Sequence, residues 1–446
     1  MRSRIAAMAL ACLTACPAWA QTPPGAPPST PATAANIVGR QITLEEAVAI
    51  ALEGQPQIVA RLADYQAARL RVDQALSPLL PQLTGSWTAA RAQTVTQSTP
   101  SSRPGGDPRT LTVTTWTDTT VARISLSQLL FDFGKNYATI DSVRKQAEVA
   151  LEDIELQRQL IAFTVKESYT NMLFSQRLIR VNQQALERAE LNLRSAQGFF
   201  DVGTRPKSDV TRAEVDVANA RVDVIRARNA ERTARVALNV AMGLPYDTPT
   251  AIIDNLAYQP VAMERGQLQG EALRQRPEYR QTRLRVDASE ALVRRTFLDF
   301  FPDITGGGFY GAARADMNEV WELNLNLNWS LFDGGNRIAR HREARANLEA
   351  ARARVKAQEL DISREVEQTV ISVEEAQERI QAAQKSVESA QENFRLAQGR
   401  FDAGVGTILE LTDAQLELTR AQNLEAQALA DYRIALARLD RSVGRR

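Results

Sequence analysis

The chain has 446 residues, and its 54 basic and 53 acidic side chains leave a net charge of only +1. This balance gives no excess of basic residues that would favour binding to a nucleic acid or to an anionic membrane surface. One histidine and two cysteines are too few for a zinc site, a cysteine–histidine pair or a serine–histidine–aspartate triad, so we expect no catalysis and no cofactor or metal.

The N-terminus has the pattern of an export signal. Two arginines precede an apolar run, and Ala18-Trp19-Ala20 fits the small-x-small motif of a cleavage site. Residues 1–20 are therefore predicted to be a signal peptide, whose removal leaves the mature chain without a thiol. The alternative is a lipobox ending at Cys16, in which that cysteine is lipidated and becomes the mature N-terminus. Residues 21–40, rich in proline and alanine, are predicted to form a flexible tether.

The rest of the chain is an internal duplication. Matching segments lie 201 positions apart in the second half of each copy and 221 apart in the first half. They include 130–134 with 331–335, Phe200 with Phe401, Gly243 with Gly444, and 81–85 with 302–306. The 20-residue difference between the two offsets falls in a Ser/Pro/Gly-rich stretch of the first copy, which we interpret as a long surface loop. We predict repeat 1 over residues 41–243, a connection over 244–263 and repeat 2 over 264–444.

Each copy is predicted to contain a helix, a β-hairpin, a very long helix and a second long helix, in that order. Residues 135–197 and 336–398 contain neither glycine nor proline, and apolar residues in the second stretch recur at steps of three and four. This spacing is the heptad pattern of supercoiled helices. The expected helix bounds are about 135–203 and 207–243 in repeat 1, and about 336–404 and 407–443 in repeat 2. A soluble antiparallel coiled coil has the same pattern, so the helices alone leave the function open.

The hairpins are predicted at about 82–128 and about 303–331. Residues 321–331 alternate apolar and polar side chains without exception, and two tryptophans in this segment are eight positions apart. That separation corresponds to roughly 26 Å at 3.3 Å per residue, close to the ~25 Å apolar band with aromatic girdles of an outer-membrane barrel strand. A half-buried strand of a soluble sheet is the alternative for one such segment, but two hairpins at equivalent places favour the barrel. The girdle tryptophans are Trp87, Trp116, Trp321 and Trp329.

On this interpretation one chain supplies only four membrane-spanning strands. A closed barrel needs about eight or more, because an open sheet edge cannot be satisfied in lipid. The sequence therefore predicts an α+β fold, mainly α, in which several copies close one transmembrane antiparallel β-barrel. The long coiled-coil helices are expected to continue from this barrel as an α-helical tube.

Over about residues 41–444 the sequence resembles the TolC family of outer-membrane efflux proteins. The most specific matches are the two Leu-Phe-Asp-x-Gly junctions, at 130–134 and 331–335, and the two tip segments that follow the long helices. The resemblance implies a homotrimer in the bacterial outer membrane, in contact with its lipid, whose barrel takes four strands from each chain and whose helices form a periplasmic tunnel. It also implies docking onto a periplasmic adaptor (membrane fusion protein) and an inner-membrane transporter, for export of drugs, metals or proteins, the last as in type I secretion.

In the family, acidic residues at the helical tips form rings that close the tunnel. The matching positions in this sequence are Glu410 and Asp413, with Asp209 in the first tip. Carboxylates around a narrow opening attract cations and repel anions. The alternative is that acidic residues in the first turn of a helix only complement its dipole.

The second tip departs from the family. The best-matched family member latches the closed end with a tyrosine and an arginine, where this chain has Phe401 and Gly406. A phenyl ring has no hydroxyl and glycine has no charge, so those links cannot form in the same way. The resemblance also assigns adaptor contact to the tip turns, for which a plain helix cap is the alternative; the turn residues are Gly203, Thr204, Gly404 and Val405.

The sequence thus predicts a passive export duct, the outer-membrane channel-tunnel of a tripartite export system. The alternative is a periplasmic coiled-coil adaptor or scaffold without a barrel. Such adaptors usually carry one hairpin and a lipoyl-like β-domain, whereas this chain duplicates its whole length. Nothing in the pattern distinguishes drug, metal and protein cargo.

Overall fold

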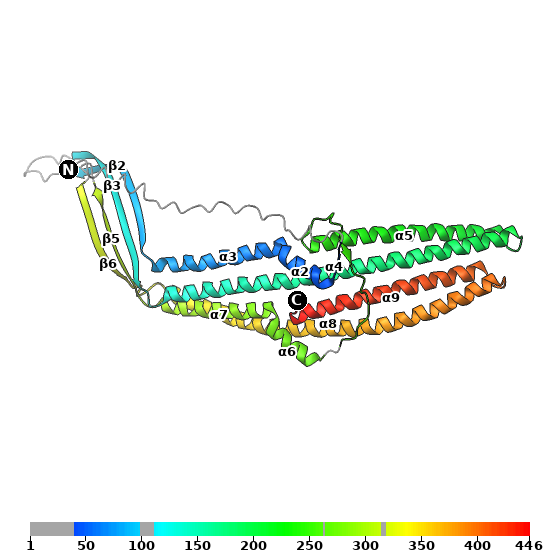
Figure 1. Ribbon diagram of the computed structural model, residues 1–446. Helices are drawn as coiled ribbons and strands as arrows, with labels where there is room; N and C mark the ends of the chain where they lie inside the picture. Colours follow the sequence, from blue (N-terminus) through cyan, green and yellow to red (C-terminus); the bar gives the residue numbers. More distant parts are fainter. Residues whose placement is uncertain (1–39, 99–110, 262–263, 314–317) are drawn as a thin grey trace, which may run out of the picture. The chain divides into compact units, whose positions relative to one another are not determined.

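The computed structural model describes residues 40–98, 111–261, 264–313 and 318–446 (Figure 1). The predicted signal peptide, almost all of the tether, the candidate lipidation site at Cys16 and most of the Ser/Pro/Gly-rich loop lie outside these residues. The chain divides into two compact units. Unit 1 takes Met1–Pro56, Ile161–Pro260 and Ala376–Ile434, and unit 2 takes Gln57–Leu160, Val261–Glu375 and Ala435–Arg446.

Helices make up most of the described chain. They are α2 (Leu44–Gly54), α3 (Pro56–Leu76), η1 (Ser77–Leu79), α4 (Lys135–Asp201), α5 (Lys207–Ala241), α6 (Arg265–Gln275), α7 (Pro277–Leu298), α8 (Asn336–Asp402) and α9 (Ile408–Val443). Helices α4 and α8 each have 67 residues, about 100 Å at 1.5 Å per residue. Both ends of α8 lie 201 positions after those of α4, so no residue has been inserted in either helix. In the parts of the chain that the structure describes, no helix combines the length and the apolar character of a membrane span.

Two helices precede each hairpin, where the sequence predicted one. The division falls before Pro56 in repeat 1 and before Pro277 in repeat 2. Proline lacks a backbone N–H and disfavours helical dihedral angles in the residue before it. Gln55 and Arg276 accordingly have extended ψ angles of 119° and 123°, and each proline begins the next helix at a position that suits it.

Unit 1 contains a short parallel pair of strands that holds the first described residues against the connection between the repeats. Strand β1 (Gln41–Ile42) pairs with β4 (Ala251–Ile252). The hydroxyl of Tyr169, a fully buried residue of α4, lies 3.1 Å from the carbonyl oxygen of Ile42 and 3.1 Å from that of Ile253. The long helix therefore fixes the two strands through one buried hydroxyl, since a buried polar group needs such a partner.

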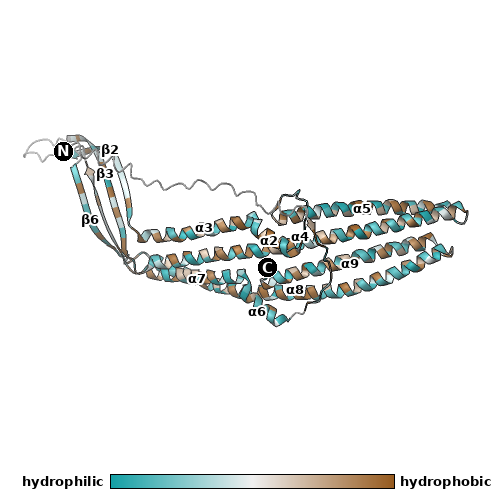
Figure 2. Ribbon diagram, viewed as in Figure 1, coloured by the Kyte–Doolittle hydropathy of each residue, from teal (hydrophilic) through white to brown (hydrophobic). Residues whose placement is uncertain are grey.

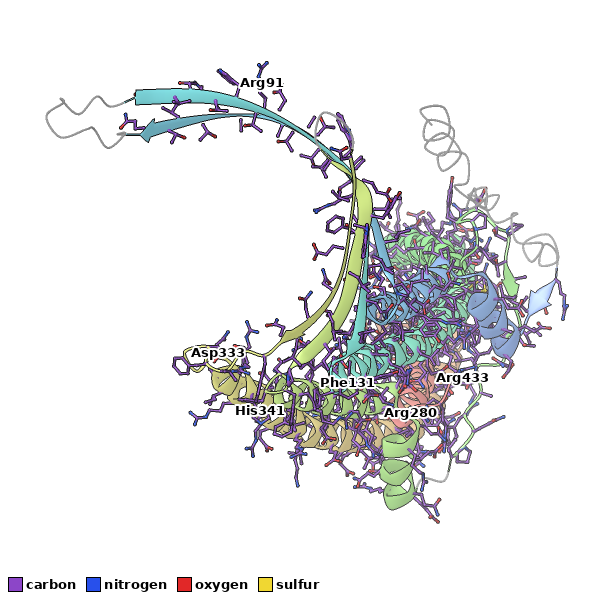
Figure 3. The ribbon with its side chains drawn as sticks, turned by 90° about the vertical axis from the view of Figure 1, so that its left-hand side faces the viewer. Arg91, Phe131, Arg280, Asp333, His341 and Arg433 are labelled. Carbon is purple, nitrogen blue, oxygen red and sulfur yellow. The ribbon has the colours of Figure 1, made fainter. Side chains whose placement is uncertain are left out.

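Unit 2 contains one antiparallel sheet built from both predicted hairpins. Its strands are β2 (Gln82–Ser98), β3 (Leu111–Phe131), β5 (Asp303–Ala313) and β6 (Asn318–Asn328), in the order β2-β3-β5-β6. Strand β3 of repeat 1 pairs with β5 of repeat 2, so the two hairpins join in one sheet. Figure 3 shows this sheet bending through a wide arc. Strands β2 and β6 form its two edges.

Strand β6 is shorter than the sequence predicted, because it ends at Asn328 and does not continue to residue 331. Its partner β5 begins at Asp303, directly opposite Asn328, and Trp329 leaves the ladder with its indole Nε1 donating to the carbonyl of Phe300 at 3.1 Å. The equivalent strand β3 continues to Phe131, since its last residues pair with β5. The length of each strand therefore depends on whether a neighbouring strand is present.

The sheet has one mainly apolar and one mainly polar face. Directly paired residues share a face, and the side chains of successive residues alternate between the faces, as the colours along the strands in Figure 2 show. The apolar face carries Leu83, Trp87, Trp116, Ile124, Leu126, Tyr310, Trp321, Leu323, Leu325 and Leu327. The polar face carries Thr84, Ser86, Thr88, Arg123, Ser125, Asn324, Asn326 and Asn328. In the single chain the apolar face is open, with Trp321 73% and Leu323 83% exposed.

Candidate functional site

The predicted tip residues lie in unit 1, at the turns from α4 to α5 and from α8 to α9 (Figure 1). Each turn has a glycine with a φ of 76°, Gly203 in the first and Gly404 in the second. Their N–H groups donate to the carbonyls of Phe200 and Phe401 at 2.9 and 3.0 Å. A left-handed residue at this place ends a helix and favours glycine. The turn residues, with Thr204 and Val405, are exposed, and their contact with an adaptor stays a prediction.

The second turn is tighter around Gly406. The N–H of Gly406 donates to the carbonyl of Arg400 at 2.8 Å. A Cβ atom added to Gly406 would lie 2.9 Å from the backbone nitrogen of Phe401 and 3.0 Å from the carbonyl carbon of Arg400. Real Cβ atoms essentially never approach a backbone nitrogen so closely. The conformation of this turn therefore excludes an arginine at position 406 unless the backbone shifts.

An arginine of the first tip, Arg205, contacts this turn. The Arg205 Nη2 atom donates to the carbonyl oxygen of Gly406 at 2.5 Å, and the guanidinium carbon lies 4.8 Å from the centre of the Phe401 ring. Its Nη1 atom is 3.7 Å from a carboxylate oxygen of Asp209, and both of these side chains are only 15% exposed. A desolvated cation over an aromatic ring contributes about 2 kcal/mol. Arg205 thus links the two tips of one chain through contacts that no sequence motif had indicated.

An apolar cluster lies beneath this contact. Phe401 is 1% exposed and packs with Ile408 and Leu411. The ring of Phe199, from the end of α4, meets the ring of Phe401 edge-on with their centres 5.6 Å apart, and Phe394 packs against the same cluster. Edge-to-face pairs contribute roughly 0.5–1.5 kcal/mol beyond their buried area. Phe401 is therefore held at the tip by apolar packing, without the hydroxyl that a tyrosine would bring.

The three predicted gate carboxylates have different environments. Asp209 pairs with Arg205 in a half-buried setting, so much of its charge is compensated. Glu410 is 3.6 Å from Arg400 with both side chains about half exposed, a pair of little energetic weight. Its backbone N–H also donates to the Thr407 hydroxyl at 3.2 Å, so its place in the first turn of α9 agrees with the dipole interpretation as well. Asp413 is exposed.

A further carboxylate, Asp216 on α5, lies beside these residues and was not predicted. It accepts a hydrogen bond from the Thr412 hydroxyl at 3.0 Å. Burial raises the pKa of Asp216 above its ordinary value and the charge of Asp413 raises it further, while Thr412 and Arg212 oppose the shift. It lines a groove of about 210 Å³ with polar residues of α4, α5 and α9, among them Asn182, Asn219, Asp223 and Gln415.

Polar side chains farther along unit 1 also connect the two repeats. The Asn192 side-chain amide donates to the Gln415 side chain at 2.6 Å, and the Gln415 amide donates to the carbonyl of Ala185 at 3.1 Å. Arg188 lies 5.9 Å from the centre of the Phe394 ring. These contacts hold α4 of repeat 1 against α8 and α9 of repeat 2. The tip contact of Arg205 is therefore one of several contacts between the repeats in unit 1.

The Leu-Phe-Asp-x-Gly junctions prove to be helix caps. The Asp132 carboxylate accepts from the N–H groups of Gly134 and Asn136 at 2.9 and 2.7 Å, at the start of α4. Asp333 accepts equivalently from Gly335 and residue 337 at the start of α8. These aspartates satisfy the free N–H groups of a helix N-terminus. Among the described residues no group of histidine, cysteine, aspartate or glutamate side chains is arranged to hold a metal ion.

Three of the four candidate girdle tryptophans lie on strands of the sheet, and the fourth lies just after β6. Trp87, Trp116 and Trp321 lie on the apolar face of the sheet, and the Arg91 guanidinium lies 5.2 Å from the centre of the Trp116 ring. Trp329 follows β6 and its indole N–H donates to the carbonyl of Phe300, in the turn after α7. A lipid boundary at these residues stays a prediction.

The protein family described as outer membrane efflux protein matches residues 47–244 and 268–445. The chain belongs to this family. The matched segments fall one in each predicted repeat, and the resemblance to the TolC family is thereby confirmed. As a member of this family the chain is placed in the bacterial outer membrane.

Individual relatives agree with this assignment. The alkaline protease secretion protein AprF of Pseudomonas aeruginosa is 26% identical over 316 residues, which are 67% of this chain and 63% of AprF. The chain thus spans less than two thirds of that curated relative. Among solved structures, the outer-membrane channel OprN has a TM-score of 0.74 at 22% identity, covering 90% of this chain and 89% of OprN. CusC, whose structures concern transmembrane channel formation, has a TM-score of 0.76 at 16% identity, covering 90% and 92%. These likenesses confirm the predicted fold class, α+β and mainly α.

Proposed function

We propose that the chain is the outer-membrane channel-tunnel of a tripartite export system, a passive exit duct that works as a homotrimer. The observation that carries this proposal is a four-stranded sheet with an exposed apolar face and two edges that are unpaired within the chain. Lipid satisfies the apolar face, and further strands must satisfy the edges, because unpaired backbone groups are costly in hydrocarbon. We assign the duct no catalytic step and no cofactor, since its partners supply the energy.

A channel-tunnel of such a system works with two further proteins, an adaptor and a transporter. A periplasmic adaptor would contact the exposed turns at Gly203, Thr204, Gly404 and Val405, and an inner-membrane transporter would select the cargo. The relative AprF is named for secretion of an alkaline protease, which favours secreted protein among the candidate cargoes over drugs and metals. The net charge of +1 gives no reason to add a nucleic acid.

At the helical tips, Glu410 and Asp413 would act as an acidic gate. Asp216 adds to this negative region, and Asp209 contributes less because Arg205 compensates it. The contact of Arg205 with Phe401 replaces the latch of the family and holds the tip closed. Three copies of these carboxylates around an opening would favour cations.

Isolation of the protein from the membrane fraction tests the assembly and location. We expect the full chain to require detergent, to migrate as a trimer on gels without heating and as a monomer after heating, and to form channels in planar bilayers. A chain released by osmotic shock as a soluble periplasmic protein would contradict the duct.

Bilayer recordings on the double variant E410A/D413A test the gate. Removal of both carboxylates should weaken the preference for cations, whereas D209A, which removes a compensated charge, should change it less. If ion selectivity and conductance stayed as in the parent, the dipole interpretation of Glu410 and Asp413 would replace the gate.

A further inference from the structure

The two hairpins of the sheet differ in length. Strands β2 and β3 have 17 and 21 residues, whereas β5 and β6 have 11 each. The outermost described pair between β3 and β5 is Val121 with Ala313, and the ladder between β2 and β3 continues beyond it. We call residues 89–98 and 111–120 the arm. Strands β5 and β6 contribute no described residue to the arm, which Figure 3 shows extending away from the rest of the sheet.

Two tryptophans mark the outer end of the apolar face. Trp321 pairs with Tyr310, and Tyr310 pairs in turn with Ile124. Trp87 pairs with Ala122, the next residue of β3 on the same face. Trp87 and Trp321 thus belong to adjacent rows of the sheet, and the leucines of β6 continue from this level toward the start of α8. In the proposed barrel, the outer aromatic girdle is therefore at this level.

Trp116 lies on the same face but much farther out, on the arm. Its partner Gln93 is six positions beyond Trp87 on β2. This separation is about 20 Å along the strand at about 3.3 Å per residue, and a strand tilt of about 40° reduces it to about 15 Å along the membrane normal. An aromatic girdle occupies one level at the membrane surface, so Trp87 and Trp116 cannot both belong to it. Trp116 is nevertheless 56% exposed.

A charged pair lies beside Trp116 on this face. Arg91 is directly opposite Asp118, with its Nε atom 3.3 Å from the carboxylate, and both side chains are more than two thirds exposed. The Arg91 guanidinium carbon lies 5.2 Å from the centre of the Trp116 ring. Charged side chains on the lipid face of a barrel are destabilising within the hydrocarbon and nearly neutral at its surface. The pair therefore supports a position of the arm outside the hydrocarbon, as the distance from Trp87 does.

We propose that Arg91 and Trp116 bind the phosphorylated sugar headgroup of a glycolipid in the outer leaflet of the outer membrane. This inference rests on the proposed duct, which places the apolar face of the sheet in lipid. The two residues continue that face directly beyond its outer edge, so the layer that they meet is the headgroup layer. We call Arg91, Trp116 and Asp118 the headgroup site.

The chemistry of the headgroup site fits this ligand. Within the described residues Arg91 makes the ion pair with Asp118 and the ring contact with Trp116, and no hydrogen bond. Its N–H groups are therefore available to a phosphate, which a guanidinium binds through two parallel hydrogen bonds. The exposed indole can pack against the C–H groups of a sugar ring while its N–H donates to a hydroxyl. The exposed ion pair itself contributes little, but the charge of Asp118 opposes that of the phosphate.

Other occupants fit this face less well. Hydrocarbon leaves the charges of Arg91 and Asp118 without water. A barrel closes through the edges of its sheets, so further copies of the chain leave the outward face of the arm free. A phospholipid supplies a phosphate but no sugar, and the experiment separates these two sources.

Retention of glycolipid by the full-length, detergent-solubilised protein tests the headgroup site. The probe is lipid A, an acylated glucosamine disaccharide that carries phosphates, in mixed micelles with the detergent. R91A should weaken retention about tenfold and W116A about fivefold, whereas D118N should strengthen it because a competing negative charge is removed. R123A is the matched control, since Arg123 lies on the polar face of the same hairpin beside Ser86; it should retain lipid A as the parent does.

The depth of the arm is measured separately. Both natural cysteines precede the predicted cleavage site, so W116C and L325C can each carry one thiol-linked fluorophore in protein that is reconstituted into vesicles of phosphatidylcholine. A nitroxide on the lipid headgroup should quench the label at residue 116 more than a nitroxide in the middle of the acyl chain, and the order should reverse at residue 325. Stronger quenching of W116C by the acyl-chain nitroxide would place the arm in hydrocarbon and overturn the headgroup site.

The outcomes separate the headgroup site from the duct. Retention of lipid A as in the parent by both R91A and W116A overturns the site, and a loss in D118N equal to that in R91A overturns the phosphate contact. Equal retention of phosphatidylglycerol by the parent, with the same loss in R91A, replaces the glycolipid by lipid phosphate in general. In each case an intact unheated trimer that conducts in bilayers leaves the duct standing, whereas a parent chain without trimer or conductance removes the proposed function itself.

Discussion

The two helical tips come from one repeated sequence, and their equivalent phenylalanines have different environments. Phe401 is 1% exposed within the cluster of Ile408 and Leu411, whereas Phe200 is 41% exposed. The guanidinium of Arg205 lies over Phe401. The turn itself is the same in both copies, with a left-handed glycine at each. Duplication has therefore preserved the backbone of the turn while the side chains of the two copies have become the two halves of one contact.

The charged residue of this contact belongs to the first tip. Arg205 and Gly406 are equivalent positions of the two repeats, and the arginine of the first donates a hydrogen bond to the carbonyl of the second. The resemblance to the family placed an arginine at 406, where the tight turn leaves no room for a side chain. In this chain the link between the tips is made by an arginine of the first repeat and not by a side chain at position 406. Four substitutions test how far the two tips differ.

The largest effect is expected from F401A. Removal of a fully buried phenyl ring should lower the free energy of unfolding by about 3–5 kcal/mol. The equivalent substitution F200A should cost less than about 1 kcal/mol, because much of that ring already faces solvent. Thermal unfolding of the detergent-solubilised protein, followed by circular dichroism, measures both. Equal losses would show that the two tips contribute alike.

The variant R205A tests the link across the tips. It removes the cation over Phe401 and the hydrogen bond to Gly406, and it leaves Asp209 without its partner, for a loss of about 1–3 kcal/mol. A weaker closed state should raise the conductance of single channels in planar bilayers. R205K keeps the charge without the planar fork and should restore only part of the effect. R400A, which removes an exposed arginine near the same turn, is the matched control.

An R205A channel that conducted as the parent does, with F401A still destabilised, would assign Arg205 to packing and not to closure.

The variant G406R returns the arginine of the family to the second tip. Because a Cβ at this position meets the backbone of Arg400 and Phe401, the turn must open, at a cost of about 1–3 kcal/mol. The same change at Gly399, where no atom lies within 4 Å of an added Cβ, should leave the melting temperature nearly unchanged. A G406R protein as stable as the parent would show that the turn adapts readily and that its glycine is not required.

Local patterns predicted the parts of the fold that depend on residues near one another in the sequence. The absence of glycine and proline predicted helices close to α4 and α8, alternation predicted β6, and the repeat predicted a hairpin at the equivalent place in the first copy. The junction of β3 with β5 was not predicted, because pairing between strands distant in the sequence leaves no periodic signal. The end of β6 at Asn328 was missed for the same reason, since it depends on a neighbouring strand.

The candidate site shows a similar limit. The acidic tip positions were found by resemblance to the family, residue by residue. Arg205 stands in a Gly-Thr-Arg-Pro turn, and nothing in that turn says which ring its guanidinium covers. The setting of Asp216 depends on Thr412 and Asp413, which are almost 200 positions away. The side-chain partners of Arg205 and Asp216 lie in the other repeat, and a single sequence does not predict such contacts.

The smallest expected effect concerns Asp216, whose pKa is raised by burial and then by the charge of Asp413. A raised pKa means that the folded protein binds this proton more tightly than the unfolded chain does, so ionisation of Asp216 destabilises the fold. The penalty is absent below the pKa of an unfolded aspartate, about 3.9, and develops as the pH rises through the folded value. The variant D216N should therefore gain melting temperature relative to the parent over that interval and keep a constant advantage above it. D223N, which removes a half-exposed carboxylate that lines the same groove, is the control for a change of charge alone. A difference between D216N and the parent that did not change with pH would assign the effect to packing around Thr412.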